Sequence, residues 1–133
     1  MTTEALHILA GWIGVFLGVL TGAVFGLAFH KENWLGGYNS WTRRMLRLGH
    51  ISFFGIAFLN FMFSITTGLE ALHGTLIQIG SILFLVGAAT MPTACFLSAW
   101  KKQLKGLFPI PVASICGALV CVITSILQTL KNP

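Results

Sequence analysis

The sequence predicts an all-α integral membrane protein that crosses the bilayer four times as a four-helix bundle. Of its 133 residues, 56% are hydrophobic and only 8% are charged, and the mean hydropathy is +0.87. An ordinary soluble domain carries about 25% charged residues. A chain this short cannot bury so much apolar surface in one core. The composition therefore excludes a soluble enzyme, a disordered tail and a nucleic-acid-binding protein.

Four apolar stretches are each long enough to cross a hydrocarbon core of about 30 Å at about 1.5 Å per helical residue. They are Leu6–Phe29, Met45–Ile65, Thr75–Trp100 and Leu107–Leu130. Each must be helical, because lipid offers the backbone no water to bind. The first is expected to be a retained span, since no basic residue precedes it and its apolar run exceeds that of a signal peptide. We expect residues 1–133 to form one domain without an extramembrane module.

The basic residues predict the orientation of the spans. Seven of the eight Lys and Arg residues lie beside two connections, the first and the third: Lys31, Arg43, Arg44, Arg47, Lys101, Lys102 and Lys105. Short basic loops stay in the cytoplasm, so both termini are predicted to face outside, in a bacterial inner (plasma) membrane. This topology explains the net charge of +5 without a nucleic-acid partner. The same cations can attract anionic lipids.

The first span carries a ladder of glycines at every fourth residue: Gly14, Gly18, Gly22 and Gly26. Glycine lets another helix backbone approach closely and gain dispersion contacts that lipid cannot match. We therefore expect a helix-packing face. Its partner can be another span of this chain, another membrane subunit or a second copy of the chain.

The second span begins with a stripe of Arg43, Arg47 and His50 at the predicted cytoplasmic boundary. Spacings of three and four residues put these side chains on one helix face. Such a stripe can bind the head group of an anionic lipid or a quinone carbonyl, although arginines that snorkel to the interface have the same pattern. Deeper in the membrane, Asn60 of this span and Gln78 of the third are expected to face protein or a cavity, because lipid penalises them.

Prolines distinguish the last two spans. Pro92 lies inside the third span, where a proline frees a carbonyl and kinks the axis. The fourth span opens with Pro109 and Pro111, which suit the first turn of a helix because its N–H groups need no helical partner.

The four histidines are candidate axial ligands of a b-type haem. His7 and His73 are predicted at the outer boundary, and His30 and His50 near the cytoplasmic one. Glu70, close to His73, can orient an imidazole. However, His7 and His30 lie about 34 Å apart along one helix, too far for a two-haem path without a further carrier. Plain interfacial histidines explain the same pattern.

Three function classes remain. The first is a helix-packing or anchoring subunit of a larger membrane complex, without a catalytic site, a required cofactor or a metal; the host complex is expected to be respiratory or electron-transferring. The second is a redox subunit that binds haem b or a quinone. The third is a small oligomeric channel. The glycine ladder and the scarcity of catalytic groups favour the first, since all three acidic residues lie outside the predicted spans.

Overall fold

The chain is all-helical over the residues that the computed structural model describes, 2–69 and 72–131, and that part contains no strand. Four long α-helices are joined by short segments that include two 3₁₀ helices. In chain order the elements are α1 (Thr3–Gly26), η1 (Trp34–Gly36), α2 (Trp41–Leu69), α3 (Thr75–Trp100), η2 (Lys102–Leu107) and α4 (Pro109–Lys131). Each of the four long segments is apolar and long enough to cross a membrane. The predicted helical class and the four candidate spans are thus confirmed.

The helix ends differ from the hydropathy boundaries where side chains or turns satisfy the backbone. The first span was expected to reach Phe29, but α1 ends at Gly26 and the next residues form tighter bonds, Ala28 N to Phe25 O and Phe29 N to Gly26 O. The second helix begins four residues early, because the hydroxyl of Ser40 accepts a hydrogen bond from Arg43 N at 3.2 Å.

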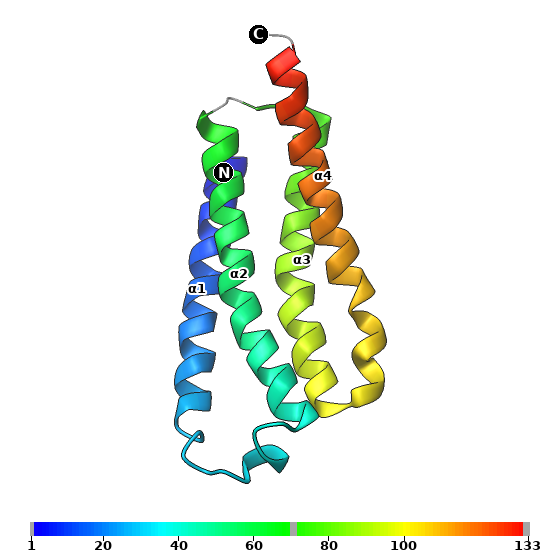
Figure 1. Cartoon of the computed structure of the whole chain (residues 1–133). Helices are drawn as coiled ribbons and strands as arrows, with labels where there is room; N and C mark the ends of the chain where they lie inside the picture. The colour runs from blue at the N-terminus through cyan, green and yellow to red at the C-terminus, as the bar shows by residue number, and fades with distance from the viewer. Residues whose placement is uncertain (1, 70–71, 132–133) are drawn as a thin grey trace.

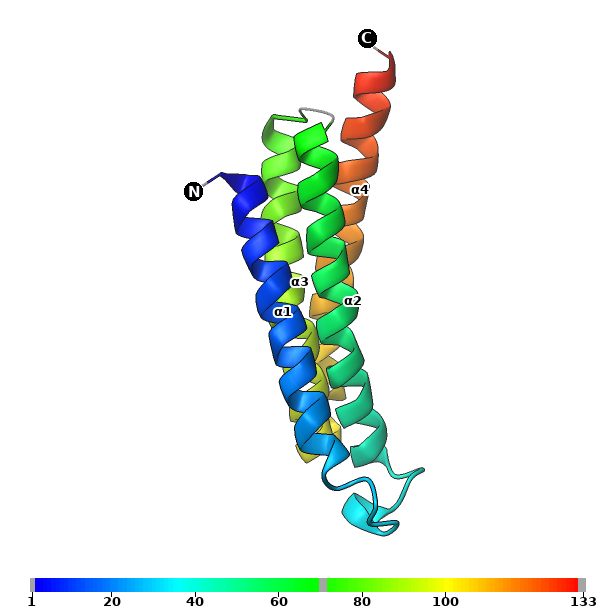
Figure 2. The same cartoon turned by 90° about the vertical axis from the view of Figure 1, so that its left-hand side faces the viewer.

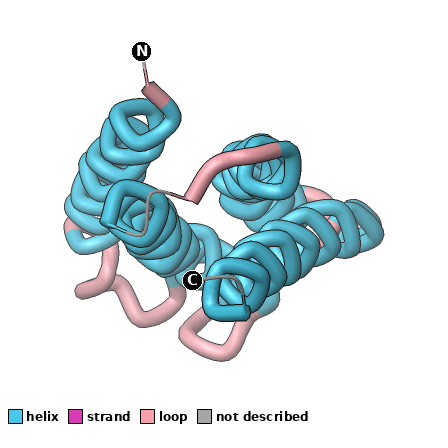
Figure 3. The backbone as a smooth tube through the Cα atoms, turned by 90° about the horizontal axis from the view of Figure 1, so that it is seen from above, coloured by secondary structure: helices cyan, strands magenta, loops and turns pink. Residues whose placement is uncertain are grey.

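The helices run side by side along one long axis, with α2 and α3 between the outer helices α1 and α4 (Figures 1 and 2). The main packing pairs are α1 with α2, α2 with α3, and α3 with α4. Figure 3, seen along the helices, places α1 and α4 on opposite sides of the α2–α3 pair. The α1–α2 and α3–α4 connections share one end, and both chain ends lie toward the other (Figure 1).

The glycine ladder of α1 packs against α2 of the same chain. A β-carbon on Gly14 would lie 3.0 Å from the Ala57 β-carbon, and one on Gly18 would lie 2.7 Å from the ring of Phe54. Contacts this close mean that a larger side chain at either position would have to displace its neighbour on α2, so glycine allows the two helices to approach. Gly26 differs from the prediction: a β-carbon there would meet nothing within 4 Å, because α1 ends at this residue.

The apolar core joins the last three helices. It is centred on Phe63 of α2, Phe84 of α3 and Ala118 of α4, all at most 2% exposed. Gly87 brings α3 close to α4, because a β-carbon there would lie 2.6 Å from the side chain of Ile115. The core therefore holds α2, α3 and α4 together in the half of the molecule that contains the α2–α3 connection, beside the buried polar groups described next.

Candidate functional site

His7 is fully buried where three helices meet. It lies on the second turn of α1, is 0% exposed and contacts two other helices. Its Nδ1 is 2.6 Å from Oδ1 of Asn60 on α2, and its Nε2 is 2.8 Å from the hydroxyl of Ser81 on α3. One imidazole therefore links three helices.

The partners define the proton positions on this ring. An amide oxygen can only accept, so Nδ1 of His7 carries a proton and donates it to Asn60. A neutral ring then accepts at Nε2 from the Ser81 hydroxyl. The amide nitrogen of Asn60 donates to Ile56 O at 2.9 Å, which supports this orientation of the amide. Each polar side-chain atom of His7, Asn60 and Ser81 then has a hydrogen-bond partner within the protein. Buried polar groups without access to water require such partners.

Aromatic rings close the site around His7. Its ring centroid lies 4.2 Å from that of Phe63 and 6.5 Å from that of Phe84. One turn away, the Ser64 hydroxyl donates to Glu4 O at 3.0 Å and fastens the start of α1 to α2. The arrangement holds three helices in one register, which is the best-attested role for a polar group inside a bundle.

The other histidines do not join His7. His73 and His30 are exposed, while His50 is half-buried, with Nδ1 3.2 Å from the Thr21 hydroxyl. Glu70, the predicted partner of His73, lies outside the described residues. Because both nitrogens of His7 are hydrogen-bonded, iron ligation there would first break one of these bonds. In the described chain, no cluster of three or more His, Cys, Asp or Glu residues could hold a metal ion.

The predicted head-group stripe is engaged by protein. Arg43 is 4% exposed, and its Nη1 donates to Glu32 O at 3.1 Å. Its guanidinium carbon lies 5.6 to 5.7 Å from the ring centroids of Phe29, Trp34 and Tyr38. These are cation–π distances. Arg43 therefore holds the α1–α2 connection against α2.

The remaining stripe residues have separate partners. Arg47 stacks 4.2 Å from the Tyr38 ring centroid and donates to Tyr38 O at 3.2 Å. His50 instead packs edge-on against Phe54 and beside Gly22 of α1. Arg43 and Arg47 therefore both contact the α1–α2 connection at Tyr38, whereas His50 contacts α1.

The start of α2 is fastened to the end of α3. Trp41 Nε1 donates to Ser98 O at 2.8 Å, and the Thr42 hydroxyl donates to Ala99 O at 3.3 Å. The last carbonyls of a helix have no partner within it, so these side chains satisfy groups that would otherwise need water. Trp41 and Thr42 therefore join α2 to α3 at this end.

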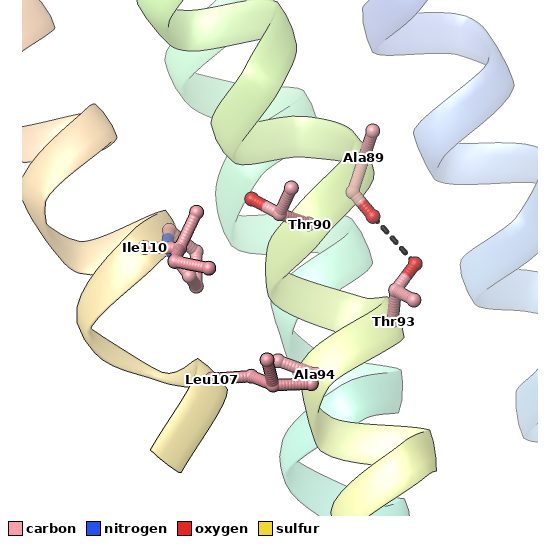
Figure 4. A pocket seen from close by; sticks show the side chains of 7 residues that line it. Ala89, Thr90, Thr93, Ala94, Leu107 and Ile110 are labelled. Atoms are coloured by element: carbon pink, nitrogen blue, oxygen red, sulfur yellow. Dashed lines mark hydrogen bonds between the residues drawn. The ribbon is translucent and has the colours of Figure 1, made fainter. Parts of the chain in front are cut away.

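A cavity of about 340 Å³ lies between α3 and α4 at the same end (Figure 4). Its walls include Thr90, Thr93 and Ala94 of α3, with Leu107, Ile110 and Pro111 from the start of α4 and the segment before it. Figure 4 shows Thr90 pointing toward Ile110 across the opening. The prolines at 92 and 111, both buried, lie beside it.

Sequence reasoning identified Asn60 as a polar residue that must face protein, and it is 1% exposed. Gln78, predicted similarly, is exposed on the first turn of α3. The sequence did not predict the hydrogen bond between His7 and Ser81. It could have been inferred only from their positions, because both residues lie within the first two turns of helices that begin at the same end of the bundle. Nothing in the sequence except the neighbouring Pro92 and Pro111 indicated the cavity beside Thr90.

Comparisons of this chain with family models, with curated proteins and with solved structures give no match.

Proposed function

We propose that this protein is an integral membrane subunit without a catalytic site, which packs against other membrane subunits or against a second copy of itself through the outward face of α1. The observation that carries the proposal is the chemistry of that face. Trp12 is 63% exposed and Phe16 is 66% exposed. Both lie within about 4 Å of the middle of α1 along its axis.

Tryptophan in membrane proteins concentrates at the water interface, where its N–H finds a partner. A large indole near the middle of a span is better covered by protein than by lipid, and aromatic residues are enriched in protein interfaces. The glycine side of α1 already contacts α2, and the Trp12 ring also packs edge-on against Phe61 of that helix, so a further partner is proposed to cover the part of the α1 surface that stays exposed. The interface is thus proposed on span one, but away from the glycine ladder.

We place the chain in a plasma membrane with both termini outside. The supporting observation is that the two basic connections share one end of the molecule (Figure 1). In a chain whose native cysteines are replaced by alanine, K105C should react with an impermeant thiol reagent only from the cytoplasm. H73C should react only from outside. The reverse pattern would overturn the orientation and leave the subunit role standing.

The subunit role is tested by purification of the tagged full chain in mild detergent. A stoichiometric companion, whether another protein or a second copy, should travel with the wild type and be lost from F16A. A central aromatic anchor contributes about 2 kcal/mol to an interface, so its removal should weaken retention about 30-fold. The matched control is I123A, which truncates a side chain that is 55% exposed on α4.

Four outcomes would contradict the proposal. A wild-type chain that purifies alone as a monomer would remove the interface. Equal loss from F16A and I123A would show that α1 is not the docking helix. Ion flux through pure protein in liposomes would instead favour the channel class. A b-type haem or bound quinone in the pure protein would favour the redox class.

A further inference from the structure

The cavity between α3 and α4 is built for hydrocarbon. Two of its polar residues direct their hydroxyls to their own helix: Thr90 donates to Val86 O at 2.7 Å and Thr93 donates to Ala89 O at 2.6 Å. The second bond is drawn in Figure 4. Both hydroxyls therefore have a hydrogen-bond partner within α3 and do not need one from a ligand. The remaining walls are aliphatic, so the cavity offers a polar ligand no partner.

The volume of about 340 Å³ lies within the range of about 300–1,000 Å³ typical of ligand sites. Its origin is visible in the sequence. Pro111 is buried at the start of α4, and the 3₁₀ helix η2 carries the chain outward before α4 begins. The two helices meet closely farther along, at Gly87, and are apart beside the cavity. The separation of the two helices and the small side chains of Ala89 and Ala94 together leave the space.

Positive charge lies close to one wall of the cavity along the chain. Leu107, one of its walls, follows Lys105 by two residues, and Lys101 begins the same turn. Both lysines are exposed, whereas the neighbouring Lys102 has its ammonium group 5.5 Å from the Trp41 ring centroid. The three acidic residues of the sequence are Glu4, Glu32 and Glu70, so α3, η2 and α4 carry none. A hydrocarbon cavity with a cationic rim is complementary to an anionic lipid.

We propose that this cavity holds an acyl chain of one anionic phospholipid whose phosphate lies against Lys101 and Lys105. The proposal rests on the membrane placement proposed above and does not depend on the subunit role. It assigns lipid to the α3–α4 turn instead of the Arg43 stripe, where the guanidinium is already enclosed by aromatic rings.

Charge should provide the selectivity of this site. Transfer of an acyl chain from lipid or detergent into the cavity exchanges one hydrocarbon environment for another and gives little driving force. Each lysine near an anionic membrane surface contributes about 1 kcal/mol. Two lysines together should therefore favour an anionic over a zwitterionic lipid by about 30-fold, since 1.4 kcal/mol is a factor of ten.

The test is native mass spectrometry of the full chain in neutral detergent, titrated with dioleoyl phosphatidylglycerol or dioleoyl phosphatidylcholine. The wild type should bind one phosphatidylglycerol about 30-fold more tightly than phosphatidylcholine. The variant K101Q/K105Q should lose this preference. T90F fills the cavity and should weaken binding of the bound phosphatidylglycerol about tenfold or more, by the cost of overpacking. T90V, which keeps the shape and removes only the hydroxyl, should bind as the wild type does.

Each failure has a distinct meaning. Equal binding of the two lipids, or a preference that survives K101Q/K105Q, would overturn the charge argument. Wild-type lipid binding by a folded T90F would show that the acyl chain lies elsewhere. If T90F does not fold, I110W blocks the mouth from a position that is 54% exposed and gives the same test. A change in oligomer size without a change in lipid binding would assign the cavity to a second copy and overturn the proposal. A chain that is soluble without detergent would instead refute the membrane placement.

Discussion

Replacing Asn60 by leucine tests whether the buried imidazole holds the helices together. The substitution keeps a side chain that branches at the γ-carbon and removes the acceptor of His7 Nδ1–H, which lies 2.6 Å away in a site where His7 is 0% and Asn60 is 1% exposed. A buried donor left without a partner costs about 1–3 kcal/mol. Hydrogen bonds between membrane helices couple by about 0.6 kcal/mol on average and up to about 1.7. Because this bond is short and dry, we expect N60L to lose about 2 kcal/mol of unfolding free energy.

The double variant H7F/N60L separates the bond from simple damage to packing. When both partners become apolar, the penalty for an unpaired group disappears. The double variant should therefore be more stable than the sum of the single losses predicts, by about 1 kcal/mol or more. Unfolding by SDS in mixed micelles, followed by circular dichroism, measures all four proteins. T90V serves as the control for a hydroxyl that bonds only its own helix. Additive losses, with coupling below about 0.3 kcal/mol, would refute the reasoning.

Three further predictions use the same protein. G18L should lose about 1–3 kcal/mol of unfolding free energy, because its β-carbon would lie 2.7 Å from the Phe54 ring. The control V19L, at a position 59% exposed, should change the unfolding free energy by no more than about 0.5 kcal/mol. Equal stability of the two variants would disprove the close packing. R43L should make residues 27–40 about tenfold more sensitive to limited proteolysis, since desolvated cation–π contacts contribute about 2 kcal/mol. The control R44L, at an exposed site, should leave cleavage of this segment unchanged. Unchanged cleavage of R43L would contradict the conclusion that Arg43 holds the α1–α2 connection. The reduced-minus-oxidised absorption spectrum of pure protein should lack b-type haem bands, and their presence would reverse the choice of function class.

The sequence predicted the helices well, because a backbone that crosses lipid must satisfy its own hydrogen bonds and a helix does so. Thr75–Trp100 was expected from hydropathy alone and is the observed α3. The errors occur at ends that hydropathy does not describe, such as Ser40, where a hydroxyl starts α2 within a polar segment. Hydropathy averages over residues, whereas a helix end depends on one hydrogen bond.

The candidate site was less predictable, because pairing between helices depends on rotation about each axis as well as depth. His7 was paired with His73 by depth, but its ring points between α2 and α3 to Asn60 and Ser81. The glycine ladder predicted close helix packing but did not identify the helix that it contacts. Only the fold assigns it to α2, and only then does the opposite face of α1, with Trp12, become the candidate interface.

The bonds from Trp41 and Thr42 to the last carbonyls of α3 have a mechanical consequence. The chain itself joins α2 to α3 at the far end, so this pair is tied at both extremities and resists splaying. The pair of α1 and α2 is closed in the same way, by the chain at one end and by the Ser64–Glu4 and His7–Asn60 bonds at the other. The helix α4 differs, because the described side-chain hydrogen bond that joins it to another helix is that of Ser114, near its start. Any large-scale bending of the molecule should therefore be taken up by the far part of α4, while α1, α2 and α3 move together.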